Sequence, residues 1–169
     1  KRALKPSGTI TLEFPHLMRL IQQAQFDTVY HEHFSYLSLN VVRRIFSSAG
    51  LRIWDVEEIE THGGSLRVYG CHIDDPKETT IAVHNLLAKE SDFGLFNLQT
   101  YLKFQKRADD IKNRLLTFLI NQKNNQKKVV AYGAAAKGNT LLNYAGIKTD
   151  LLPVVFDAAA SKQGHWMPG

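Results

Sequence analysis

A chain of 169 residues can bury a core and is long enough for one domain, or for two small units joined by a linker. Hydrophobic residues make up 44% of it and charged residues 22%, which is the usage of a folded globular protein and excludes a disordered one. The net charge of +5 gathers mainly in residues 103–128 and near the two ends. A diffuse excess of this size is more typical of a solvated helix face or of affinity for a phosphorylated small molecule than of a nucleic-acid-binding surface.

The first half of the chain mixes strand and helix patterns. Strands are expected where β-branched and apolar residues gather between turn signals, at residues 9–14, 51–60 and 65–72. Helices are expected where apolar residues recur every three or four positions, at residues 16–24 and 39–49, the second ending at Gly50. The last two strands are joined by a short turn, so we predict an antiparallel hairpin that ends an otherwise parallel sheet.

The second half begins where Asp75-Pro76 breaks the sheet. Residues 80–89 and 98–121 have helical spacing, and the longer helix is an amphipathic connector followed by a polar linker at 121–128. Strands are then expected at residues 128–132 and 152–156, on either side of a glycine-bearing turn at residues 133–138 and a helix through residue 143. A strand, helix and strand in this order imply a parallel pair, so the fold class is α/β.

The cysteine content and the apolar runs limit the classes of protein. The sequence holds one cysteine, Cys71, which excludes an internal disulfide and a cysteine zinc cage within this chain. Its longest apolar runs, such as residues 115–120, fall far short of the roughly 20 residues that a membrane span needs. No signal peptide is evident, so we expect a cytoplasmic protein without a membrane partner. Both ends are abrupt, so we expect a fragment of a longer chain.

The densest group of reactive side chains is Tyr30-His31-Glu32-His33. If the segment is extended, His31 and His33 share one face, while Tyr30 and Glu32 share the other. Imidazole, phenol and carboxylate groups together suit proton transfer near neutral pH. Two alternatives remain open: a zinc site at His31 and His33, for which no third ligand is identifiable, and a polar loop without a chemical role.

Three other segments have both a chemical and a structural interpretation. Residues 133–140 lie between a strand and a helix and resemble a P-loop incompletely, so they either bind phosphate or allow close helix packing. From the residues alone, His62-Gly63-Gly64 is explained best as a simple hairpin turn, because glycine supplies the positive φ that such turns need. Asp157 follows a strand, where it can bind ribose or sugar hydroxyls or cap the next helix.

Taken together, these segments resemble the sugar C-methyltransferases of deoxysugar and antibiotic-sugar biosynthesis. The likeness spans nearly the whole chain, and its motifs follow the order of that family. The matching stretches are Leu4-Lys5-Pro6-Ser7-Gly8, Glu13-Phe14-Pro15, Phe26-Asp27-Thr28-Val29-Tyr30-His31-Glu32-His33-Phe34, His62-Gly63-Gly64-Ser65-Leu66-Arg67, Tyr132-Gly133-Ala134-Ala135-Ala136-Lys137-Gly138-Asn139-Thr140 and Lys162-Gln163-Gly164.

The resemblance implies a domain division and a reaction. Residues 1–75 would end an S-adenosylmethionine-dependent, Rossmann-like methyltransferase domain, residues 76–126 would form the helical connector, and residues 127–169 would begin a second, truncated Rossmann-like domain. Zinc would be bound only by a missing N-terminal domain, and this fragment alone would be inactive. The reaction would remove a proton beside a keto group of a nucleotide-linked deoxysugar, and the enolate would then take the methyl group.

The resemblance also implies roles for particular residues. His33 would be the base, and Tyr30 and Glu32 would line the sugar site and handle protons. Glu13 and Pro15 would contact the methyl donor. The residues that would bind the acceptor are His62, Gly63, Gly64, Lys137, Gly138, Asn139, Asp157 and Lys162.

The sequence departs from the family pattern at residues 157–161, and His165-Trp166 replaces a basic and aromatic pair, which leaves the acceptor's identity open. Two other functions stay as alternatives. One is a nucleotide-sugar-binding module without catalysis, and the other is a metal-dependent hydrolase centred on His31 and His33.

Overall fold

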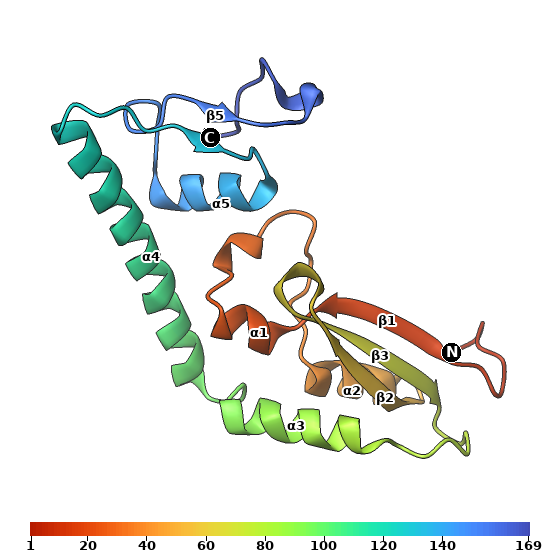
Figure 1. Ribbon diagram of the computed structural model, residues 1–169. Coiled ribbons are helices and arrows are strands. Elements are labelled where there is room, and N and C mark those ends of the chain that lie inside the picture. The colour runs from red at the N-terminus through yellow and green to blue at the C-terminus, as the bar shows by residue number, and fades with distance from the viewer. The chain divides into compact units, whose positions relative to one another are not determined.

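The computed structural model describes the backbone of residues 1–169 and every side chain except that of His62. The chain divides into two compact units (Figure 1). The first comprises residues 1–24 and 35–102, and the second comprises residues 25–34 and 103–169. In the part of the chain so described, none of the helices is long and apolar enough to cross a membrane. The domain boundaries expected near residues 75 and 126 remain a prediction.

The first unit contains a three-stranded sheet in the order β1 (Ile10–Pro15), β3 (Ser65–His72), β2 (Leu51–Ile59). The predicted hairpin is confirmed, since β2 and β3 pair antiparallel. The expectation of parallel neighbours in the rest of this sheet is wrong, because β1 also pairs antiparallel with β3. β1 and β2 do run in the same direction, but β3 returns from its tight turn and lies between them.

Helix α2 (Leu39–Ser48) packs on this sheet through Leu39, Val42 and Phe46. Phe46 lies directly over Gly70 of β3, where a Cβ atom would collide with its ring. The Ser38 hydroxyl accepts a hydrogen bond from Val41 N at 3.2 Å, which caps the start of α2. The predicted end of this helix at Gly50 is confirmed by the left-handed backbone there, with φ of 68°.

Three more helices belong to the first unit or begin in it. Helix α1 (Leu17–Gln22) is short and buries Met18, Leu20 and Ile21. Helix α3 (Ile81–Phe93) ends at Gly94, and α4 (Leu98–Asn124) begins in the first unit and continues into the second. Helix α4 extends three residues beyond its predicted end at residue 121, because its polar Gln and Lys residues have good helix propensity.

The second unit contains β4 (Ala131–Tyr132), α5 (Ala136–Ala145) and β5 (Val155–Phe156). Strands β4 and β5 are parallel, as the pattern predicted, but each is only two residues long. Helix α5 begins inside the predicted turn at 133–138, because Ala136 and Lys137 are good helix formers and Gly138 tolerates the helical backbone. The Rossmann-like assignment of either unit remains a prediction.

Candidate functional site

The histidine segment forms a turn in the second unit, and not the extended segment for which the alternation of its side chains was considered. The short 3-10 helix η1 (Phe26–Thr28) precedes it, and His33 N donates a hydrogen bond to Tyr30 O at 3.1 Å. This turn, residues 30–33, is called the histidine turn below. The segment has no ladder partner to hold it extended, so the expected alternation of His31 and His33 on one face is wrong.

The histidine turn brings together Tyr30 and His33, two of the three residues expected to be catalytic. Their rings meet edge to face, with centroids 5.0 Å apart and an interplanar angle of 67°. Both side chains are half-buried, whereas His31 and Glu32 are exposed. Among the described side chains, no three histidine, cysteine or acidic residues are grouped so that they could hold a metal ion. The hydrolase hypothesis therefore has no third ligand there.

Asp157 joins the ends of the two parallel strands of the second unit. Its carboxylate accepts hydrogen bonds from Ala159 N at 2.8 Å and from Ala134 N at 2.7 Å. Lys162 Nζ lies 3.3 Å from the same carboxylate. The two backbone N–H groups, with help from Lys162, hold the pKa of Asp157 below its ordinary value. Asp157 is therefore an anion at neutral pH that fixes the glycine-bearing loop.

A hollow of about 860 Å³ opens beside this loop and is lined by Asn139, Asp157 and Lys162, all expected to bind the acceptor. The Oδ1 atom of Asn139 is buried and has no hydrogen-bond partner in the structure. Lys137 and Gly138 lie in the same first turn of α5 but outside that lining. The hollow therefore combines a carboxylate, an ammonium group and an amide at the carboxyl ends of parallel strands, where α/β folds bind ligands.

The other predicted site residues belong to the first unit. Glu13 forms an ion pair with Arg67 at 3.0 Å, and Pro15 ends β1 opposite Ser65. Gly63 and Gly64 border a hollow of about 520 Å³. The side chain of His62, also expected at the acceptor site, lies outside what the structure describes.

Comparison with known proteins supports the assignment made from the motifs. Residues 60–169 match the family described as C-methyltransferase C-terminal domain. The chain belongs to this family. It is also 35% identical over 166 residues to the C-methyltransferase NovU of Streptomyces niveus. That alignment covers 98% of this chain and 40% of NovU, so the chain spans less than half of that relative's length.

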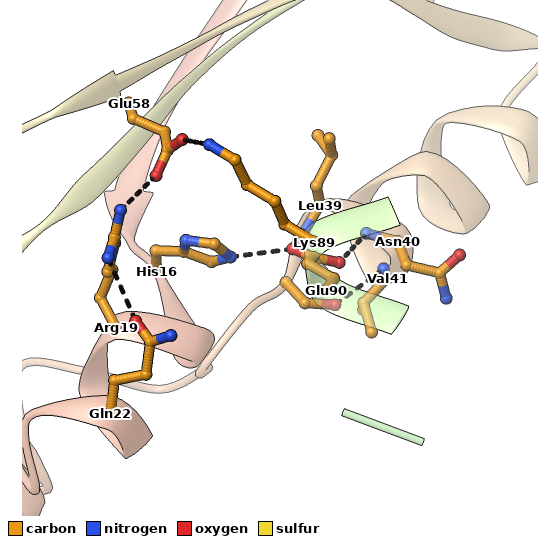
Figure 2. A network of polar contacts seen from close by, with 10 residues as sticks. His16, Arg19, Gln22, Leu39, Asn40, Val41, Glu58, Lys89 and Glu90 are labelled. Atoms are coloured by element: carbon orange, nitrogen blue, oxygen red, sulfur yellow. Dashed lines mark hydrogen bonds and ion pairs between the residues drawn. The ribbon is translucent and has the colours of Figure 1, made fainter. Parts of the chain in front are cut away.

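This C-methyltransferase family member also contains a buried polar network that the sequence analysis missed (Figure 2). His16 Nε2 lies 2.9 Å from Glu90 Oε1, and both side chains are fully buried. The Glu90 carboxylate also accepts hydrogen bonds from Leu39 N at 2.5 Å and Asn40 N at 3.0 Å, at the start of α2. A carboxylate only accepts, so Nε2 of His16 carries the proton between them.

The sequence does hold a signal for that network. Val83, Leu86 and Glu90 follow one another at helical spacing, and all three are buried on one face of α3. An acidic residue at a core position of an amphipathic helix predicts a buried partner.

A second, more exposed network surrounds Glu58 in the same family member. Glu58 accepts hydrogen bonds from Lys89 at 2.7 Å and from Arg19 at 2.8 Å, both visible in Figure 2. The bond from Lys89, followed by that from Arg19, lowers the pKa of Glu58 despite its partial burial. Arg19 and Glu58 line the same hollow of about 520 Å³ as Gly63 and Gly64, so the lining of that hollow carries charged side chains.

Proposed function

We propose that this chain is part of an enzyme that transfers a methyl group to a carbon beside the keto group of a nucleotide-linked deoxysugar. The observation that carries the proposal is the pairing of His33 with Tyr30 in a turn that shares a compact unit with the hollow lined by Asn139, Asp157 and Lys162. Family membership and the likeness to a C-methyltransferase support the reaction class.

In this mechanism His33 takes the proton from the carbon beside the keto group, because imidazole titrates near neutral pH. Tyr30 lies against the His33 ring and can donate its phenolic proton toward the enolate oxygen. Glu32 is exposed at the same turn and supports the charged imidazole as it forms. The proton would pass to His33 and the electrons of the C–H bond would form the enolate, whose carbon can then take the methyl group.

S-adenosylmethionine is the usual donor of this class of enzyme and would supply the methyl group as an electrophile. In this proposal Glu13 and Pro15 contact the donor. The Oε2 atom of Glu13 already accepts a hydrogen bond from Arg67 Nη2 at 3.0 Å. These two residues alone do not make a donor site.

The acceptor's nucleotide would bind in the hollow beside α5. The Lys162 ammonium group suits a phosphate, and the Asn139 amide and Asp157 carboxylate suit hydroxyl or base donors. Lys137 in the first turn of α5 adds a second cation at a helix N-terminus, where anions are favoured. A titration of the chain with thymidine or uridine diphosphate should therefore shift the amide resonances of residues 133–140 saturably.

Replacing His33 with Asn in the full-length protein tests the proposed base. We expect turnover to fall by about 100-fold to 10,000-fold, the usual contribution of a general base, with acceptor binding retained. Exchange of the acceptor's acidic proton with deuterated water should fall in parallel. His31→Asn is the matched control, because His31 is exposed in the same turn and should change turnover only slightly.

The same two variants separate the alternatives. A binding module without catalysis would be indifferent to both substitutions. A metal enzyme would lose its ion and its activity with either. Undiminished turnover in His33→Asn would show that the proposed base is wrong.

A further inference from the structure

Tyr144 of α5 connects two parts of the second unit that are far apart in sequence. Its ring packs on that of Phe26 in η1, with centroids 5.0 Å apart and an interplanar angle of 53°. Its hydroxyl donates a hydrogen bond to Asp109 Oδ1 of α4 at 2.6 Å and accepts one from Gln105 Nε2 at 2.9 Å. The Lys112 ammonium group lies 5.6 Å from the centre of the ring. The ring is therefore held from its hydroxyl end and on its faces.

The hydrogen bond to Asp109 keeps the phenol in its donating form. It raises the pKa of Tyr144. Together with a hydrogen bond that Gln105 Nε2 donates to Asp109 Oδ2 at 3.5 Å, it lowers the pKa of Asp109. Tyr144 thus stays neutral and Asp109 stays ionised at neutral pH, which is the pairing that gives a short, charge-assisted bond.

Backbone hydrogen bonds connect Phe26 to the histidine turn. Val29 N donates to Phe26 O at 3.0 Å, and Tyr30 N donates to Thr28 O at 3.0 Å. These bonds lead directly into the bond from His33 N to Tyr30 O. Beyond the turn, Phe34 is 95% exposed, so it adds little burial there. Phe26 is thus the aromatic residue that attaches this segment to the second unit.

We propose that Tyr144 is a positioning residue that holds the histidine turn, through Phe26, on the helix whose first turn carries the candidate nucleotide-binding residues. The role rests on the proposed function, in which His33 is the base and Asn139 contacts the acceptor. Because Tyr144 and Asn139 lie on the same helix, the distance from a bound acceptor to His33 would then be set by the second unit itself. A base gains much of its effect from such fixed placement.

Backbone order parameters from ¹⁵N relaxation of the chain test the contact without any turnover. Rigid backbone gives about 0.85, and flexible segments fall below about 0.6. We expect Phe26→Ala and Tyr144→Ala to lower the values at residues 30–33 toward the flexible range. Tyr144→Phe keeps the ring and should lower them less. Phe34→Ala is the matched control, because it removes an exposed ring beside the same turn and should leave the values unchanged.

Unchanged order parameters in both alanine variants would overturn the proposal. Tyr144→Ala could unfold the second unit, which would appear as lost dispersion of the α5 amide resonances. In that case Phe26→Leu serves as the test variant, since leucine keeps apolar volume but removes the ring. A rigid turn in Phe26→Leu would likewise overturn the proposal.

Turnover in the full-length protein provides the second readout. Losing an aromatic contact of this kind should lower kcat about twofold to tenfold while the KM for the acceptor stays the same. Phe26→Tyr should restore the wild-type kcat, and a rise in KM without loss of kcat would contradict positioning. If the full-length protein transfers no methyl group, the proposed function fails, while the order parameters still decide whether Tyr144 holds the turn.

Discussion

Replacing Glu90 with alanine tests whether the buried network organises the first unit. The fully buried carboxylate accepts hydrogen bonds from His16 Nε2, Leu39 N and Asn40 N. The substitution leaves all three donors without their acceptor and removes the cap that α3 provides to α2. Removing one partner of a buried pair costs about 3–5 kcal/mol. Loss of a helix cap costs about 1 kcal/mol, but it concerns the same donors, so we expect a total loss of about 3–5 kcal/mol.

Urea unfolding followed by tryptophan fluorescence measures that loss. Trp54 reports on the first unit, because it lies in β2 with its ring 5.7 Å from that of Tyr69. Trp166 is 90% exposed and should change little. Glu90→Gln keeps one acceptor oxygen and should lose about 1–3 kcal/mol. Glu78→Ala removes an exposed carboxylate and should stay within about 0.5 kcal/mol. A loss below about 1 kcal/mol for Glu90→Ala would refute the reasoning.

Three further outcomes follow from the packing and the charges. Gly70→Ala places a methyl group against the Phe46 ring and should lower the unfolding free energy by about 1–3 kcal/mol in the same assay. Burial raises the pKa of the Cys71 thiol, so we expect a disulfide reagent at pH 8 to label the folded chain at least tenfold more slowly than the unfolded chain. The lowered pKa of Asp157 stabilises the fold above the unfolded-state value of about 3.9, and this stability is lost as pH falls through the folded pKa. Carboxyl NMR titration should show that low pKa, and Lys162→Ala should raise it.

Local patterns predicted the elements because each element obeys a short-range rule. The Gly50 stop of α2 and the tight turn between β2 and β3 need only backbone geometry. Apolar spacing placed α3 and α4 within a few residues of their observed bounds. The order of the sheet was harder, because the position of β3 between β1 and β2 depends on long-range pairing. No local pattern encodes which strand fills that place.

The candidate site shows the same limit. Tyr30 and His33 were proposed from their chemistry and from the family resemblance, but the edge-to-face contact of their rings depends on a turn that their sequence pattern did not indicate. Asp157 was correctly placed at a strand end, yet its bond to Ala134 joins two loops that only the parallel pair brings together. Tyr144 lies on a helix with no unusual pattern, so its contact with Phe26 could not be seen from the sequence.

The division of the chain into two units separates the residues of the proposed mechanism into two groups. The histidine turn belongs to the second unit, although the chain enters it from Ala24 and leaves it to Ser35 in the first. The residues proposed to bind the nucleotide, including Asn139 and Asp157, belong to that second unit as well. In the proposed mechanism, proton removal would therefore use groups that one compact unit carries. Glu13, proposed to contact the donor, belongs to the other unit, so the proposed enolate formation and methyl transfer would use residues of different units.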